Sequence, residues 1–574
     1  MISRIITWCA DNRFLVFTGT VMVTVWGIWA MTATPLDAVP DISDVQVIVS
    51  TEWAGRSPDI IEDQVTYPIV TSLLSAPRVR TVRGFTDFGI SYVYVIFEDG
   101  TDIYWARSRV LEYLQGVRAR LPEDITPTIG PDATGVGWVF QYALVDETGQ
   151  HNLAELRGIQ DWFLRYSLAS VEGVAEVASI GGFVKQYQVN LDPNKLAAYD
   201  KSVKDVVQAI KSSNNDVEGR LMEFSGREYM VRGRGYLQSV DDIAAVSLGA
   251  DARGTPVRVG DVAHVALGPD IRRGVADLDG KGEVVGGIVV MRFGENALRV
   301  IERVKARMQD VQRALPSGVR IIPTYDRSGL INEAIGTLRR TLIEEAIVVS
   351  LVILVFLFHV RSALVPMLVL PVAVIASFIP MYYLDVTSNI MSLGGLALAI
   401  GVLVDASIVM VENAYRRVSE ADQPIPYEEQ PGAIVQAAKQ VGRPIFFSLA
   451  IIIVSFAPVF LLEAQEGRMF RPLAFTKTSA MMWASLLSIT VVPVLMVMFI
   501  RGRRLRPESS NPVSRFFTWL YEPVLRLALR FKWTALLVNL AVVPLTIPLL
   551  LGIGSEFMPP LYEGSMLYMP TSPP

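Results

Sequence analysis

Seven long apolar runs constrain the fold of this 574-residue chain more than any other feature of its sequence. One helical crossing of a bilayer needs roughly 17–25 mostly apolar residues. The runs lie at about 14–33, 342–360, 363–384, 391–413, 445–463, 478–500 and 535–554. Because lipid offers no hydrogen-bond partners, such runs cross it as helices that satisfy their own backbone groups. The sequence therefore predicts a polytopic α-helical membrane protein with about seven transmembrane helices.

The long polar stretch between the first two runs predicts a large folded region outside the membrane, because it is too long for an unstructured loop. The predicted organisation is a first transmembrane helix at 1–33, an outer region at 34–335, transmembrane helices two to six at 336–500, a cytoplasmic basic linker with an interfacial helix at 501–534, a seventh transmembrane helix at 535–554, and the start of a second outer domain, cut short, at 555–574.

Positive charge sets the predicted orientation, because cytoplasmic connections carry an excess of Lys and Arg. With alternating spans, these basic residues fall on one side: Arg4, Arg13, Arg361, Arg416, Arg417, Lys439, Arg443, Arg501, Arg503, Arg504, Arg506 and Arg515. We therefore expect a cytoplasmic N-terminus and an outward-facing region 34–335. The aromatic and basic stretch 515–533 predicts an amphipathic helix on the inner membrane surface, with a plain cytoplasmic linker as the alternative.

The outer region contains an internal repeat. The stretch that begins at Tyr92 matches the stretch that begins at Gly286, so that Val110 corresponds to Val304. Each copy predicts an apolar strand, a glycine turn, an amphipathic helix and a second strand. Strands separated by helices of this length indicate βαβ units. The predicted fold class is therefore a helical membrane protein with a large α/β domain of repeated, porter-like βαβ subdomains.

Composition argues against several function classes. The formal net charge of −5 gives no indication of nucleic-acid binding. One cysteine, Cys9, permits neither a disulfide framework within the chain nor a Cys-cluster zinc site. The three histidines lie far apart in the sequence, and neither an HExxH zinc motif nor a Walker-type phosphate loop is present. These observations favour a transporter over an enzyme.

The apolar run at 391–413 carries a carboxylate at its centre, Asp405, and a second near its end, Glu412. A charge at bilayer depth costs roughly 3 kcal/mol on insertion scales, and ionisable groups placed there usually serve function. Asp405 is therefore a predicted proton carrier, with a structural polar residue as the alternative. Glu412 lies two turns further along the same face, and is either a second relay member or a solvated glutamate at the membrane edge.

Several stretches carry a resemblance to a known family. They are PDISDVQV (40–47), the stretch 81–114 that begins TVRGFTDFGI, GPDATGVGWV (130–139), NIMSLGG (389–395), VDASIVMVEN (404–413), EGRMFRPLAFTKT (466–478) and the basic run after the sixth span. In order and spacing along the whole chain they resemble the resistance-nodulation-division (RND) pumps, in the heavy-metal efflux branch of the copper/silver type. A complete pump of this family has a second half of similar size, so the chain resembles an N-terminal half.

The resemblance implies a proton-driven antiporter in the bacterial inner membrane, with the region 34–335 in the periplasm. It also implies a homotrimer, embedded in lipid, that joins a periplasmic membrane-fusion adaptor and an outer-membrane channel, with no nucleic acid and no resident cofactor. In the family, the aspartate that matches Asp405 is the proton-relay carboxylate, and its partner is a lysine from the second half. Divalent-cation pumps usually carry a second aspartate where this chain has Ala399, so the pattern favours Cu(I) or Ag(I) as the transported ion.

Methionine thioethers are soft ligands that suit Cu(I) and, by the same softness, Ag(I). By resemblance, four methionines form a relay across the membrane: Met391, Met410, Met481 and Met496. Met569 matches the first of three methionines in an outer cleft, and Glu563 matches a carboxylate at that cleft. Leu403 and Ile271 stand where the family has further relay methionines. For any single methionine in the bundle, ordinary packing is the alternative interpretation.

Three functions remain open at this point. The first is proton-driven efflux of Cu(I) or Ag(I). The second is a truncated fragment that does not transport. The third is an RND pump for other cations or for organic compounds. Pumps for organic compounds usually carry a second aspartate beside the first, where this chain has Ala406, and this position therefore counts against an organic substrate.

Overall fold

The computed structural model describes residues 1–574 apart from 124, 251–253, 273, 358, 420–424, 501–510, 555–564 and 571–574. By its internal contacts the chain divides into two compact units. The first unit contains the helical bundle and one α/β sheet, and comprises Met1–Val139, Met291–Glu302 and Asp326–Pro574. The second unit comprises Phe140–Val290 and Arg303–Tyr325.

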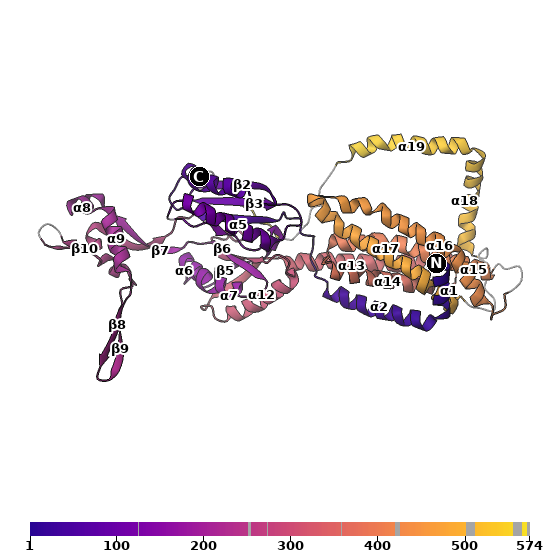
Figure 1. Ribbon diagram of the computed structural model, residues 1–574, viewed down its shortest axis with the longest axis horizontal. Helices are drawn as coiled ribbons and strands as arrows, with labels where there is room; N and C mark the ends of the chain where they lie inside the picture. Colours follow the sequence, from indigo (N-terminus) through magenta and orange to yellow (C-terminus); the bar gives the residue numbers. More distant parts are fainter. Residues whose placement is uncertain are drawn as a thin grey trace. The chain divides into compact units, whose positions relative to one another are not determined.

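Long helices, labelled in Figure 1, make up most of the first unit. They are α1 (Ile2–Asp11), α2 (Arg13–Ala33), α13 (Arg327–Leu357), α14 (Val360–Tyr383), α15 (Ile390–Ser419), α16 (Gln430–Ser455), α17 (Ala464–Phe499), α18 (Pro512–Arg530) and α19 (Lys532–Gly552). A 3₁₀ turn, Ala457–Leu461, follows α16.

Six helices in the described part of the chain are long and apolar enough to cross a membrane. They are α2, α14, α15, α16 with its 3₁₀ turn, α17 and α19, and they coincide with six of the seven predicted runs. The remaining run, 342–360, covers the end of α13 and continues past Phe358, which lies outside the described residues. That span therefore stays a prediction.

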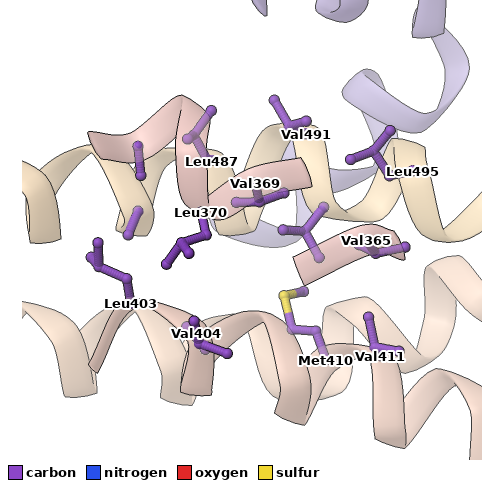
Figure 2. Packing of buried hydrophobic residues seen from close by; sticks show 14 of the residues in the cluster. Val365, Val369, Leu370, Leu403, Val404, Met410, Val411, Leu487, Val491 and Leu495 are labelled. Carbon is purple, nitrogen blue, oxygen red and sulfur yellow. The ribbon is translucent and has the colours of Figure 1, made fainter. Parts of the chain in front are cut away.

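α15 is the central helix of the bundle. It packs against α13, α14, α16 and α17. Figure 2 shows its side chains Val404 and Val411 in one apolar cluster with residues of two neighbouring helices, Val365 of α14 and Val491 of α17 among them. Because lipid tails are as apolar as these side chains, the helices are held together by close packing rather than by removal from water.

The contact between α15 and α17 depends on a glycine. A Cβ atom added to Gly395 would lie 2.4 Å from the carbonyl oxygen of Leu473, so no larger residue fits there without moving a helix. Beside this contact the Thr476 hydroxyl of α17 donates a hydrogen bond of 2.7 Å to the carbonyl oxygen of Ser392. Small residues allow helices in membranes to approach in this way, and the hydrogen bond fixes the register of the pair.

The first α/β sheet has the strand order β2-β3-β1-β4. Its strands are β1 (Gln46–Glu52), β2 (Val79–Asp87), β3 (Ile90–Phe97) and β4 (Thr128–Ile129). β1 pairs antiparallel with both β3 and β4, so β3 and β4 run parallel and need a crossover connection. The helix α5 (Ile103–Val117) provides it and buries Val110, Leu114 and Val117, at the predicted helical spacing.

The second sheet repeats this arrangement, with the order β14-β5-β13-β6. Its elements are β5 (Trp138–Asp146), β6 (Val174–Gly181), β13 (Val285–Met291), α12 (Ala297–Gln312) and β14 (Val319–Asp326). Thus β5 takes the place of β1, β6 that of β2, β13 that of β3 and β14 that of β4. The strand–helix–strand repeat predicted from sequence is confirmed, and it extends to all four strands of each sheet.

A shared irregularity supports this correspondence. The helix between the first two strands is α3 (Pro58–Ile61) and α4 (Tyr67–Leu73) in the first sheet, and α6 (Leu153–Ile159) and α7 (Arg165–Ala169) in the second. Each pair is joined by one π-helical turn, Glu62–Thr66 or Gln160–Leu164. π-turns are rare, so the same interruption at the same place marks the two subdomains as copies of one unit.

A further subdomain is inserted between β6 and β13. Its elements are β7 (Lys185–Leu191), α8 (Pro193–Ala198), α9 (Val203–Ser213), β8 (Val217–Phe224), β9 (Arg227–Gly233), α10 (Val240–Ala244), β10 (Ser247–Ala250), β11 (Pro256–Arg258), α11 (Val259–Val262) and β12 (Ala263–Pro269). β7 pairs with β12, and β8 with β9. Every residue of the β8–β9 hairpin is exposed.

Aromatic side chains mark one end of the bundle. Trp26 and Trp29 of α2 meet Tyr383 and Tyr382 of α14 at ring-centroid distances of 6.0 and 4.9 Å. Trp and Tyr are enriched where membrane proteins meet the interface between lipid and water. This cluster therefore favours a membrane surface at the end of the bundle from which the chain continues into β1.

We expect Gly395→Ala to destabilise the 574-residue chain by about 1–3 kcal/mol, the usual effect of overpacking a close contact. The matched control is Gly394→Ala, because no described atom lies within 4 Å of a Cβ at that position. Thermal unfolding in detergent, followed by size-exclusion chromatography, measures both variants. Equal midpoints for the two variants would show that the approach of α15 to α17 is not set by glycine.

Candidate functional site

Asn389 fixes the start of α15, the helix that carries both predicted relay carboxylates. It is fully buried, and its side-chain oxygen accepts hydrogen bonds from the backbone N–H groups of Met391 (3.0 Å) and Ser392 (2.9 Å). In return, its own N–H donates to the Ser392 hydroxyl at 2.8 Å. Asparagine is among the best residues for capping helix N-termini in this way, so the position of every later side chain along α15 is set here.

Asp405 lies about 22 Å along α15 from its first residue, at a rise of about 1.5 Å per residue. This places it at mid-depth of a membrane span. The neighbouring side chains Val404 and Ala406 are 5 % and 6 % exposed, whereas Asp405 itself is exposed. The carboxylate therefore projects from a helix that is otherwise enclosed.

Apart from Arg416 and Arg417 in its last turn, the exposed residues of α15 form one narrow stripe. They are Leu398, Gly401, Asp405 and Val409, and they recur at the spacing of three or four residues that defines one helix face. A Cβ added to Gly401 would meet no described atom within 4 Å. Since the rest of the helix is packed against four neighbours, this stripe is the face of α15 that the described chain leaves uncovered.

The two carboxylates of α15 have different surroundings. The Glu412 carboxylate lies 2.8 Å from the Arg416 guanidinium, one turn further along, and its side chain is 41 % exposed. Within the described residues, no hydrogen bond or ion pair is formed by the Asp405 side chain. Glu412 thus forms an ordinary ion pair at a helix end, whereas the Asp405 carboxylate is exposed on a helix long and apolar enough to cross a membrane and has no partner among the described residues.

The four relay methionines fall on two helices. Met410, Met481 and Met496 are fully buried in the bundle core, and Met391 is partly buried. Met391 and Met410 belong to α15, Met481 and Met496 to α17. The two helices run in the same direction (Figure 2).

Their levels along the bundle follow from helix geometry. Ser392 and Thr476 are hydrogen-bonded and therefore lie at the same level. At about 1.5 Å per residue, Met410 lies about 27 Å below Ser392, and Met496 lies about 30 Å below Thr476. Met481 is about 7 Å below Thr476 on the same scale. Met410 and Met496 thus lie within about 3 Å of one level, whereas Met391 and Met481 differ by about 9 Å along the bundle.

The surroundings of Met410 are apolar and tight. A Cβ added to Gly442 of α16 would lie 3.7 Å from the Met410 methyl carbon and 2.7 Å from Ile6 of α1. Met410 therefore fills the space between α15, α16 and α1. Packing accounts for its position, and a soft ligand at that position is compatible with the same geometry.

The other predicted metal-site positions differ in how deeply they are buried. Met569 is 70 % exposed in an irregular segment, while Glu563 lies outside the described residues. Leu403 is buried in the core and Ile271 is 70 % exposed. Ala399 is fully buried, so the position at which divalent-cation pumps carry an aspartate is an apolar core position here.

A further carboxylate, Glu345 of α13, was not singled out from the sequence. One of its carboxylate oxygens is buried and has no hydrogen-bond partner among the described residues. The signal was present in the sequence, since Glu345 falls within the apolar run 342–360. Among the described residues, no group of three or more His, Cys, Asp and Glu side chains is placed to hold a metal ion.

The sequence matches the AcrB/AcrD/AcrF family over residues 5–574. It is 51 % identical to the cation efflux system protein CusA of Escherichia coli K12, in an alignment that covers 100 % of this chain and 55 % of the relative. It is 36 % identical to the cobalt-zinc-cadmium resistance protein CzcA of Cupriavidus metallidurans, over 99 % of this chain and 54 % of that protein. The chain thus spans about half the length of the curated relatives it matches.

Solved structures match the fold. The X-ray crystal structure of a heavy metal efflux pump, in its second crystal form, superposes with a TM-score of 0.83 at 31 % sequence identity. The match covers 96 % of this chain and 53 % of that chain. Both the helical bundle and the repeated α/β subdomains therefore have a counterpart in a known pump.

Two substitutions of Met410 separate packing from metal contact. Met410→Ala should lower the free energy of unfolding by about 2–5 kcal/mol, because it leaves a cavity in the core. Met410→Leu conserves volume and should cost less than about 1.5 kcal/mol. Thermal unfolding with and without Ag(I) measures both effects. If Met410→Leu keeps its stability and also keeps any stabilisation by Ag(I), the thioether makes no contact with the ion.

Proposed function

Since the chain belongs to the AcrB/AcrD/AcrF family of RND transporters, with a cation efflux system protein among its similar relatives and a heavy metal efflux pump among the matching structures, we propose that it forms part of a proton-driven pump that exports Cu(I) or Ag(I). The pump is a secondary active transporter and not an enzyme. The metal ion is its substrate, and we propose no resident cofactor.

The exposed stripe around Asp405 is the observation that carries this proposal. A carboxylate at bilayer depth must face protein or water, yet α15 buries its other faces and leaves this one bare. We propose that a helix from the remainder of the pump covers the stripe and brings a cation to Asp405. Proton binding neutralises Asp405 and releases that cation, so protonation changes how the two helices attract each other.

The driving force for this step is adequate. Moving one elementary charge across a membrane potential of 100 mV supplies roughly 2.3 kcal/mol. Population shifts of allosteric systems typically need about 1–3 kcal/mol of coupling. One proton per cycle, bound at Asp405 from one side and released to the other, therefore suffices to bias a helix rearrangement. Glu412, already paired with Arg416, is proposed as a minor member of the relay near the membrane edge.

The metal specificity is proposed from the methionines. Thioethers select soft monovalent ions such as Cu(I), whereas carboxylates suit harder cations. The thioethers of α15 and α17 offer soft contacts at several depths of the bundle, and by resemblance Met569 and Glu563 are proposed as contacts at an outer cleft. The apolar Ala399 supports a monovalent ion, because no second carboxylate is available at that position.

We propose that the complete pump is a homotrimer in the bacterial inner membrane, joined to a periplasmic adaptor and an outer-membrane channel. The proposed N-terminus is cytoplasmic, and the α/β subdomains are periplasmic. The aromatic cluster of α2 and α14 supports a membrane surface on that side. The amphipathic helix α18 begins where Asn511 donates a hydrogen bond of 2.8 Å to the carbonyl oxygen of Phe356, a geometry that suits a helix lying on the opposite surface.

Replacing the proposed proton carrier tests the function directly. In the complete pump, Asp405→Asn should reduce silver tolerance of the host to the level of a pump-free strain, because asparagine cannot bind and release a proton. Membrane expression should be unchanged. The matched comparison is Glu412→Gln, which should retain most of the tolerance. Wild-type tolerance in Asp405→Asn would remove Asp405 from the relay.

The outer metal contact is tested by two neighbouring methionines. Met569→Ile should weaken Ag(I) binding to the complete pump by about tenfold, equivalent to the loss of roughly 1.4 kcal/mol. Met566→Ile is the matched control, because Met566 lies three residues away in the same irregular segment and is fully exposed. Isothermal titration measures both variants. Equal affinities for the two would exclude Met569 from the site.

A further inference from the structure

Twelve residues, 34–45, connect α2 to β1 without forming a helix or a strand. Ten of them, Pro35–Asp44, are called the strap below. Its hydrogen bonds reach the first turns of three bundle helices on one side and the first α/β subdomain on the other. All of these groups belong to the first unit of the chain.

The strap is bonded to the start of α15 through its backbone. The N–H of Ser388 donates to the carbonyl oxygen of Pro35 at 2.9 Å, and the N–H of Asp37 donates to the carbonyl oxygen of Ser388 at 3.0 Å. Two residues later the N–H of Ile390 donates to the carbonyl oxygen of Ala38 at 3.1 Å. A movement of α15 along its axis therefore pulls the strap with it.

The strap is bonded to the start of α13 through a buried arginine. Arg327, the first residue of α13, has a side chain that is only 6 % exposed, and its guanidinium lies 2.9 Å from the Asp37 carboxylate. The same guanidinium donates to the carbonyl oxygen of Val136. Arg327 also directly follows β14 in the chain, so this side chain links the strap to the segments that lead into and out of the second sheet.

The strap is bonded to α17 through a second arginine. Arg468 donates to the carbonyl oxygen of Ile42 at 3.0 Å and to that of Ser43. Its guanidinium also pairs with the carboxylates of Asp44 and Asp99. The three helices α13, α15 and α17 thus each hold a different part of one short segment.

The other side of the strap is bonded to the first α/β subdomain. The Thr134 hydroxyl donates to the Asp41 carboxylate at 2.7 Å. Asp44 lies 3.0 Å from Arg80 of β2. Directly after the strap, the carbonyl oxygen of Val45 accepts a hydrogen bond of 2.8 Å from Phe97 of β3. The strap is therefore bonded to the bundle helices on one side and to the first α/β subdomain on the other.

We propose that the strap is the coupling element that conveys the protonation state of Asp405 to the α/β subdomain. This inference rests on the proposed function. Helix shifts of about 1–2 Å are common in switching proteins, and packed elements respond to them by changing between discrete arrangements. Because the strap holds α13, α15 and α17 together, a shift of α15 relative to the other two must change its bonds to Arg327 or Arg468.

The Asp37–Arg327 pair fits this role better than a purely stabilising one. Burial raises the pKa of the Asp37 carboxyl above its ordinary value, although the nearby Arg327 guanidinium acts in the opposite direction. Desolvation thus outweighs the attraction, and buried ion pairs of this kind contribute little to stability compared with apolar contacts. The strap also connects four stretches that the sequence had singled out, namely 40–47, 130–139, 389–395 and 466–478.

Hydrogen exchange of the complete pump in lipid nanodiscs tests the proposal without metal. Asp405→Asn imitates the protonated state, and we expect it to change exchange at the amides of β1 and β3 by about fivefold or more, the low end of allosteric coupling. In the Arg327→Met or Arg468→Met background, the same comparison should show no change at β1 and β3. If the two arginines only stabilise the fold, replacing them should raise exchange by the same amount whether position 405 is Asp or Asn.

The matched control is Arg320→Met, because Arg320 lies seven residues before Arg327 and its ion pair with Glu147 is exposed. This control should keep the full response. Thr134→Val removes only one bond to Asp41 and should reduce the response by about twofold, so the test does not depend on the arginine variants folding. If Asp405→Asn still changes exchange at β1 and β3 in the Arg327→Met and Arg468→Met backgrounds, the coupling role of the strap is wrong and the proposed function is unaffected. If Asp405→Asn changes no exchange at β1 and β3 in the otherwise wild-type pump, the coupling role is also wrong. Transport by Asp405→Asn would instead contradict the proposed function itself.

Discussion

The rest of the structure depends on the close packing of α15 against its neighbours. Gly395 allows α17 to approach to van der Waals distance, and the Thr476 hydroxyl locks the register of the two helices. Since lipid offers no hydrophobic driving force between helices, such contacts decide which faces are enclosed. Among the described residues, they enclose α15 up to its last turn except for the stripe around Asp405. The candidate site is thus defined by the packing around it, as much as by its own residues.

The same helix connects the proposed proton site to the region outside the membrane. Asn389 caps α15, and the two residues on either side of that cap are bonded to the strap. Asp405 therefore lies on a rigid element whose far end is tied to a β-sheet. The first α/β subdomain can move as one body when the strap shifts, because its sheet packs against its own helix. In the proposed pump, such ties couple a proton bound in the bundle to the region outside it.

Much of this was predictable from local sequence. The six long apolar helices follow from apolar length, the strand–helix–strand repeat from periodicity, and the helix α18 from its amphipathic pattern. The depth of Asp405 follows from its place in the run 391–413. The sequence predicted only the strand–helix–strand half of each subdomain. The other half of each subdomain shares strand order and a π-turn with its counterpart, but no residue pattern that the sequence shows. The unpaired oxygen of Glu345 was missed, although the residue lay in an apolar run.

The sequence by itself determined which segments enter a membrane, which carboxylates and thioethers lie at depth, and which family the chain resembles. These properties depend on residue type and spacing along one helix. Only the tertiary structure decided that Asp405 lies in an uncovered stripe of α15, and that Asp37, Arg327 and Arg468 meet at one strap. Those contacts join residues as far apart as Asp44 and Arg468, and their pairing depends on how helices pack, which no local pattern encodes.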